Sequence, residues 1–221
     1  MIKRVAFLIL CSTIFSVSTF GAATINGPTG LIEVPTAESL KYKEYNIVVD
    51  YNLSSDNSDV SALFYKANLG TFRGWELGIV GGEVPSEGVF VNAKYYLMSD
   101  NSQYPLSLAL GMENLTSAAL TNFYLVGTKL FSNGIHGHMG FKAHLSGDLD
   151  ASVMGGLEYF LDDQLSLLSD INGDRRIYKV NAGLRYLLSP DCMIRLAVID
   201  IGSSHTAGTL FSFGVSFTGF L

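Results

Sequence analysis

The sequence predicts an all-β protein that folds as a single closed antiparallel transmembrane β-barrel of about 12 strands in an up-and-down meander. Three observations support this fold class. Segments of about ten residues alternate between apolar and polar side chains along most of the chain. Apolar residues make up 48% and charged residues 15% of the sequence, yet no stretch after residue 23 is apolar enough and long enough for a membrane helix. All five prolines lie outside the alternating segments, as a hydrogen-bonded sheet requires.

Two segments define the predicted ends of the barrel. In residues 209–221, phenylalanine and valine side chains share one face, and serine, glycine and threonine share the other. Residues 44–53 show the same alternation, with Asp50 in the middle of the polar face. A carboxylate in that place needs water or a partner. We therefore predict that these two strands pair to close the barrel, with their apolar faces against lipid.

The N-terminus has the features of a signal peptide rather than of the fold. Lys3 and Arg4 precede an apolar run over residues 5–17, and small residues follow at positions 21–23. These are the three parts that a signal peptidase substrate combines. We predict a signal peptide over residues 1–23 with cleavage after Ala23, and hence export to the outer membrane of a Gram-negative cell.

Composition narrows the possible partners of the exported chain. Without residues 1–23 the chain has 12 basic and 20 acidic residues, a net charge of −8. This acidic balance argues against a nucleic-acid partner. Cys192 is then the remaining cysteine, so no disulfide framework is expected.

Residues 24–43 precede the first predicted strand and are interpreted as a periplasmic lead-in or a small plug. Residues 27–37 read GPTGLIEVPTA, and this stretch resembles the start of the mature region in YjbH-like outer-membrane proteins, which are longer chains associated with exopolysaccharide. The resemblance implies a barrel and a link to polysaccharide. Residues 44–221 are predicted to form the transmembrane barrel.

The rest of the chain repeats one unit, a strand followed by a short polar connection. The alternation predicts twelve strands, an even number as in bacterial barrels. They cover residues 44–53, 61–69, 75–82, 89–98, 106–113, 123–131, 138–145, 151–161, 165–171, 178–188, 192–200 and 209–221.

Aromatic residues near the strand ends supply a second test of this assignment. If both termini face the periplasm, rings gather on the lipid face near each membrane interface, because amphipathic aromatic side chains favour the headgroup zone. The predicted periplasmic girdle consists of Tyr45, Trp75, Tyr95, Tyr159, Tyr186 and Phe217, and the predicted outer girdle of Tyr51, Tyr124, Tyr178 and Phe211.

The opposite face of each strand is predicted to line the lumen, and its charges nearly cancel. Two interpretations stay open: the charges form a salt-bridge lattice that packs a narrow barrel, or they line a narrow aqueous pore and select solutes. The predicted lumen-lining charged residues are Asp50, Lys66, Glu76, Lys94, Glu113, Lys129, Lys142, Glu158, Asp170, Lys179, Arg185 and Arg195.

The sequence offers little for catalysis or metal binding. His138 and His144 share the inward face but are separated by about 20 Å along an extended strand, too far to act on one nucleophile. His205 follows Ser203 and Ser204 in a predicted outer loop, and no G-x-S-x-G motif is present. No metal-ligand spacing or phosphate-binding glycine loop occurs. We predict no enzyme activity, no cofactor and no metal.

These observations favour a small porin-like channel for small solutes or ions. The alternative function is a non-catalytic structural or accessory barrel for export of exopolysaccharide or another surface polymer. The partners expected are outer-membrane lipid, the barrel-assembly machinery and small solutes or polysaccharide. At the level of the fold, the alternative is a secreted β-sandwich that buries its apolar faces between two sheets.

Overall fold

The computed structural model describes residues 21–55, 62–83, 88–101, 105–117, 119–145, 150–174, 177–202 and 208–221. His205, Ser203 and Ser204 lie outside these residues, as does most of the predicted signal peptide. Twelve strands form the fold, so the predicted strand number is confirmed. They are β1 (Glu44–Ser54), β2 (Ala62–Phe72), β3 (Trp75–Gly82), β4 (Phe90–Met98), β5 (Ser107–Glu113), β6 (Asn122–Leu130), β7 (Ile135–His144), β8 (Asp150–Phe160), β9 (Leu165–Asp174), β10 (Ile177–Ser189), β11 (Cys192–Ile199) and β12 (Leu210–Phe220).

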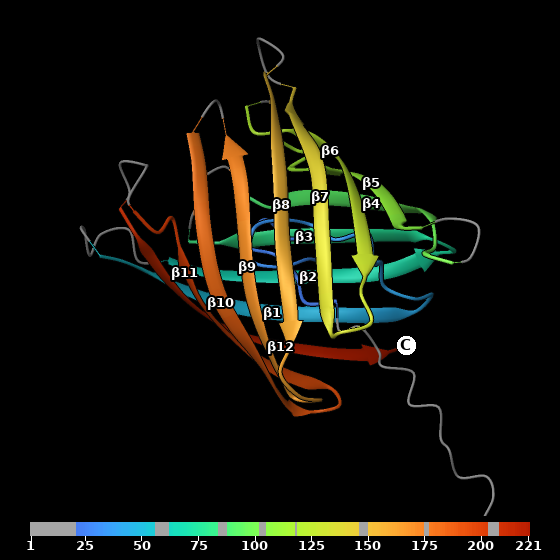
Figure 1. Cartoon of the computed structure of the whole chain (residues 1–221). Coiled ribbons are helices and arrows are strands. Elements are labelled where there is room, and N and C mark those ends of the chain that lie inside the picture. The colour runs from blue at the N-terminus through green and yellow to red at the C-terminus, as the bar shows by residue number, and fades with distance from the viewer. Residues whose placement is uncertain are drawn as a thin grey trace, which may run out of the picture.

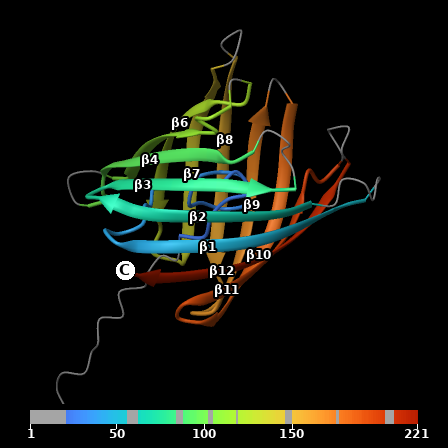
Figure 2. The ribbon, with the colours of Figure 1, turned by 180° about the vertical axis from the view of Figure 1, so that it is seen from behind.

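The strands form one closed barrel in which every strand pairs with its neighbours in sequence. Figures 1 and 2 show this ring from opposite sides. The predicted seam is confirmed, because β1 pairs antiparallel with β12 from Glu44 opposite Phe220 to Ser54 opposite Leu210. Closure satisfies the backbone groups that an edge strand would leave unpaired. Below, the base is the end of the barrel where β1 begins and β12 ends, and the mouth is the opposite end.

Side chains alternate between a buried inner face and an exposed outer face, as the pleat of a strand requires. On β1, for example, Asn46, Val48 and Asp50 are buried inside, whereas Ile47 and Val49 are exposed outside. The outer face is mainly apolar and the inner face is mainly polar. This is the arrangement of a transmembrane barrel, not of a β-sandwich. Within the described residues, no helix is long and apolar enough to cross a membrane.

Arginine substitutions on the outer face test whether that face lies in the lipid bilayer. Leu196 lies outside, in the middle of β11, and Leu196→Arg is expected to destabilise the barrel by about 2–4 kcal/mol, the penalty for a cation at the bilayer midplane. Unfolding by urea in lipid vesicles provides the measurement. Leu188→Arg, close to the base end of β10, is the matched control and is expected to cost about 0–1 kcal/mol. Equal effects at both positions would contradict the assigned membrane depth.

One strand has the opposite orientation from the prediction. On β6, Tyr124, Val126 and Thr128 are buried inside and Phe123 and Leu125 are exposed outside. Tyr124 is therefore not part of an outer girdle, and Lys129 does not line the middle of the lumen. Alternation does not distinguish the two faces of β6, because both are largely apolar and its charged residue, Lys129, is close to the end of the strand.

Residues 21–40, hereafter the plug, lie inside the barrel. Figures 1 and 2 show the blue plug within the ring of strands. The two ends of the plug meet, because a Cβ added at Gly21 would lie 3.5 Å from a methyl carbon of Leu40. The plug leads into β1 at the base over Gly70, where an added Cβ would lie 1.9 Å from the carbonyl oxygen of Lys41. Only glycine allows the chain to pass this close to β2.

Candidate functional site

Most of the predicted lumen charges do lie inside. Lys179, on β10, is only partly buried, and Lys129 sits at the base rim, where it forms an ion pair with Asp100 over 2.9 Å. The predicted charged residues that the structure buries in the lumen are Asp50, Lys66, Glu76, Lys94, Glu113, Lys142, Glu158, Asp170, Arg185 and Arg195.

A charge cluster ties together the two ends of the barrel sheet. Asp50 on β1 accepts hydrogen bonds from Lys66 on β2 and from Nη2 of Arg195 on β11, the latter at 3.0 Å to each carboxylate oxygen. Asp50 reaches Arg195 across Gly214 of β12, where a Cβ would lie 2.0 Å from Oδ1 of Asp50. Because all three charges are buried, each depends on the others for compensation.

A second cluster binds the plug to β3 and β4. Glu76 accepts hydrogen bonds from the backbone N–H of Thr29 at 2.9 Å, from the Thr29 hydroxyl at 2.7 Å and from the backbone N–H of Leu40 at 3.1 Å. Lys94 lies 3.4 Å from Glu76 and donates to the Thr29 carbonyl oxygen at 3.0 Å. Both charges therefore bind the plug at Thr29, and each also binds a backbone group near its C-terminal end, Glu76 at Leu40 and Lys94 at Glu38.

Asp170 on β9 forms the most concentrated contact with the plug. Its Oδ2 accepts hydrogen bonds from three successive backbone N–H groups, those of Ile32, Glu33 and Val34, at 2.9, 2.8 and 3.1 Å. Successive N–H groups that converge in this way form an anion-binding nest. Oδ1 accepts from the amide of Asn181 at 2.6 Å. Within the described part of the chain, no lysine or arginine forms an ion pair with Asp170, so the plug supplies most of its compensation.

Two arginines bind the plug through its carbonyl oxygens. Arg185 donates to the carbonyl oxygens of Gly30 and Leu31, and is itself held by Glu158 at 3.1 Å. Arg195 donates to the carbonyl oxygen of Ala23 at 2.6 Å. Carboxylates on the wall thus meet plug N–H groups, and cations meet plug C=O groups. The backbone of the plug, more than its side chains, is what the wall charges recognise.

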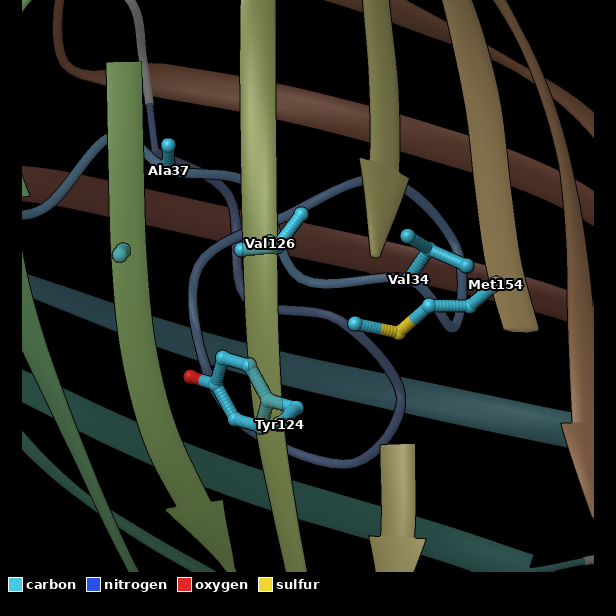
Figure 3. Close-up of a cluster of buried hydrophobic side chains, with 6 residues drawn as sticks. Val34, Ala37, Tyr124, Val126 and Met154 are labelled. Atoms are coloured by element: carbon cyan, nitrogen blue, oxygen red, sulfur yellow. The ribbon is translucent and has the colours of Figure 1, made fainter. Parts of the chain in front are cut away.

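Apolar contacts hold the plug between opposite walls. Val34 and Ala37 pack against the wall of β5 to β8, with Tyr124, Val126 and Met154 (Figure 3). Leu31 and Ile32 pack against the wall of β9 to β12. The plug therefore occupies the middle of the lumen and contacts the wall on both sides.

Sequence reasoning did not identify several neutral wall residues that also bind the plug. Asn68 donates to the Gly27 carbonyl oxygen at 2.8 Å, Asn92 to that of Asn26 at 3.0 Å, and Thr128 accepts from the N–H of Ala37 at 2.9 Å. Asn68 and Asn92 have the inward parity of their predicted strands, which was a usable signal, because a buried amide in a barrel needs a partner.

The other predicted site residues have ordinary structural surroundings. The girdle residues other than Tyr124 lie on the outer face, and Trp75 packs against Tyr95 with ring centroids 4.8 Å apart. His138 hydrogen-bonds Thr128 at 2.9 Å and His144 hydrogen-bonds Asn122 at 3.0 Å. Among the described residues, no group of three or more His, Cys, Asp or Glu side chains is arranged to hold a metal ion.

A closed twelve-stranded antiparallel barrel with an apolar exterior and a charged interior has the fold of an outer-membrane channel. The solved KdgM porin has this fold, with a TM-score of 0.61 and 16% identity over 80% of this chain and 99% of the porin. The NanC porin is similar, with a TM-score of 0.53 and 14% identity over 80% of this chain and 99% of that porin.

A third solved structure is the COG4313 outer membrane channel from Pseudomonas putida F1. Its TM-score is 0.51 at 9% identity, over 83% of this chain and 98% of the channel. At such identities the likeness concerns the fold. No protein-family model matches the chain, and no curated protein matches it. The resemblance of residues 27–37 to YjbH-like proteins therefore stays a prediction.

Proposed function

We propose that the protein is an outer-membrane channel of the porin class for small solutes or ions, closed by its own plug. The observation that carries this proposal is that charged groups on the lumen wall bind the backbone of a segment that enters and leaves at the base. A barrel that served only as a membrane anchor could pair these charges with one another. Here, Asp170 has the plug as its main partner.

The size of the barrel supports a transport role. Barrels of eight strands are filled by their own side chains, whereas those of sixteen or more enclose an aqueous channel. A barrel of twelve strands encloses enough space for a peptide segment, and the same space can admit water and small solutes when that segment leaves. The solved KdgM and NanC porins and the COG4313 channel, which share the fold, are consistent with this role.

The contacts of the plug suit a reversible closure. The plug has no helix or strand of its own, and its two isolated bridges join Ala23 to Thr29 and Gly30 to Pro35. Its polar contacts with the wall are hydrogen bonds, three of them to Asp170 and three to Glu76, and an ion pair between Glu33 and Lys179. Water can replace such contacts when the plug moves out. Since both ends of the plug are at the base, it can leave the lumen without disturbing the pairing of β1 with β12.

Deletion of residues 24–40 tests the channel directly. We expect the wild-type protein to conduct rarely in planar bilayers and the deletion variant to show steady conductance steps. The control is a heated and unheated electrophoresis comparison, which shows whether the variant still folds into a barrel. A folded deletion variant that remains silent would overturn the channel proposal.

A structural barrel is the second candidate, because a filled lumen is also what a non-conducting barrel would contain. The same deletion distinguishes the two functions: the structural candidate predicts a folded but silent variant. A role with exopolysaccharide rests on the resemblance of residues 27–37 alone.

Placement in the outer membrane after removal of a signal peptide is part of the proposal. Cleavage after Ala23 would remove the carbonyl oxygen that binds Arg195, so mass spectrometry of the mature N-terminus would show whether that contact exists.

A further inference from the structure

We infer that Lys179 is a switch residue, which pairs with Glu33 of the plug when the barrel is closed and with Asp170 of the wall when the plug has left. This inference rests on the proposed function, because it assumes that the plug leaves the lumen. It assigns the regulation of opening to a short stretch of β9 and β10 near the mouth.

The closed state places two carboxylates together. The amide nitrogen of Asn181 donates to Asp170 at 2.6 Å and also to Glu33 at 3.2 Å. Two carboxylates that share one donor repel each other. Lys179 lies 3.6 Å from Glu33, and its side chain is 25% exposed. Asn172 is the other donor to Glu33, at 3.5 Å. The Lys179–Glu33 pair is therefore long and partly solvated, and such pairs contribute little stability.

When the plug leaves the lumen, Asp170 and Lys179 both lose the partners that the plug supplies. Glu33 leaves with the plug, and Asp170 loses the three N–H groups of residues 32–34. Asp170 then needs a new partner, because an uncompensated carboxylate in a narrow lumen is costly. The two arginines on the same wall, Arg185 and Arg195, are already bound to Glu158 and Asp50.

Lys179 is in position to supply that partner. Asn181 is directly opposite Asp170, and Lys179 is directly opposite Asn172, so Lys179 and Asp170 are diagonal neighbours on the inner face. Diagonal positions are about 7–8 Å apart at the backbone, within reach of a long side chain. Lys179 thus gains a stronger partner on opening than the one it loses.

The direction of the expected effect separates this switch from a simple clamp. If Lys179 merely held the plug through Glu33, Lys179→Gln would loosen the plug. If Lys179 stabilises the open state through Asp170, the same substitution disfavours opening. The two models predict opposite signs for one substitution.

Thiol labelling of the plug measures opening without relying on conductance. Ala37 is fully buried against the wall, so Ala37→Cys in a Cys192→Ser background reacts with a water-soluble maleimide when the plug is out. We expect Lys179→Gln to slow this labelling about 5- to 30-fold, the factor that corresponds to one or two kcal/mol. Tyr42→Cys, exposed at the base, is the control for reagent access and is expected to label equally in every variant.

The effect must also depend on Asp170. In an Asp170→Asn background the open state has no carboxylate for Lys179, so Lys179→Gln is expected to leave labelling unchanged or to accelerate it. Faster labelling of Lys179→Gln with Asp170 intact, or equal slowing in both backgrounds, would overturn the switch. Absence of labelling in all these variants would overturn it as well. The channel proposal fails separately, if the barrel without residues 24–40 does not conduct.

Discussion

Replacement of Asp50 by alanine is expected to lower the free energy of unfolding by about 3–5 kcal/mol, because it leaves buried charges without a partner. Asp50 compensates both Lys66 and Arg195, and each of the three side chains is at least 96% buried, with exposed fractions of 1%, 1% and 4%. The cluster also joins β1 and β2 to β11 across the closing seam. Loss of the carboxylate therefore places two like charges side by side where the barrel closes.

Urea titration in lipid vesicles provides the measurement, and the single tryptophan, Trp75, gives a fluorescence signal. Asp100→Ala is the matched control. It removes the Lys129–Asp100 pair, whose lysine side chain is 41% exposed, and exposed pairs of this kind contribute about 0–1 kcal/mol. A second variant, Asp50→Asn, retains the shape and tests the charge alone. An Asp50→Ala variant as stable as Asp100→Ala would show that Lys66 and Arg195 find water or other partners.

The strands could be predicted because a barrel wall in lipid imposes a period of two on its sequence. Lipid selects apolar residues at one parity and the lumen tolerates charges at the other, so each strand carries its own signal. The prediction fails on β6 because Tyr124 and Val126 face the plug instead of water. Where the plug fills the lumen, the wall residues that contact its apolar side chains are apolar as well. In such a strand both faces are apolar, so alternation no longer shows which face points into the lumen.

The pairing of the lumen charges could be predicted only in part. Their inward parity puts Lys66 and Lys94 on the two strands that flank β3, so either lysine could be the partner of Glu76. Glu76 is directly opposite Lys94 across β3 and β4, and the ion pair forms there. Lys66 binds Asp50 instead, because the register places Lys66 opposite Val80, four residues from Glu76, and makes it a diagonal neighbour of Asp50. Cross-strand register is set by the whole sheet and is not visible in a single strand.

The location of the plug was beyond local sequence patterns. Its composition was compatible with either a lead-in or a plug, because glycine and proline occur in both. The contacts that hold it inside join residues far apart in the chain, such as Thr29 with Glu76, Ala37 with Thr128 and Ile32 with Asp170. Only after the barrel closes do these partners surround the plug.

Replacement of Asp170 by asparagine is expected to raise the open probability of the channel about 10- to 100-fold. Hydrogen bonds to a charged group contribute about 1.5–3 kcal/mol, and each 1.4 kcal/mol is a factor of ten in an equilibrium. Asparagine keeps the shape of Asp170 but accepts weakly from the N–H groups of Ile32, Glu33 and Val34. The substitution also removes the carboxylate with which Lys179 is inferred to pair in the open state. The expected increase therefore means that the three N–H hydrogen bonds of the closed state outweigh that single pair.

Single-channel recording in planar bilayers measures this change, with electrophoresis of heated and unheated samples to verify that the barrel is folded. Glu113→Gln is the matched control, because Glu113 is equally buried and binds Lys142 at 3.0 Å. Glu113 also lies on the opposite wall from Asp170, at the end of β5, and no hydrogen bond joins it to a plug residue within the described chain. Its variant is expected to open as rarely as the wild type. Equal opening of the two variants would mean that loss of any buried carboxylate loosens the barrel, and the nest at residues 32–34 would then have no special part in closing the lumen.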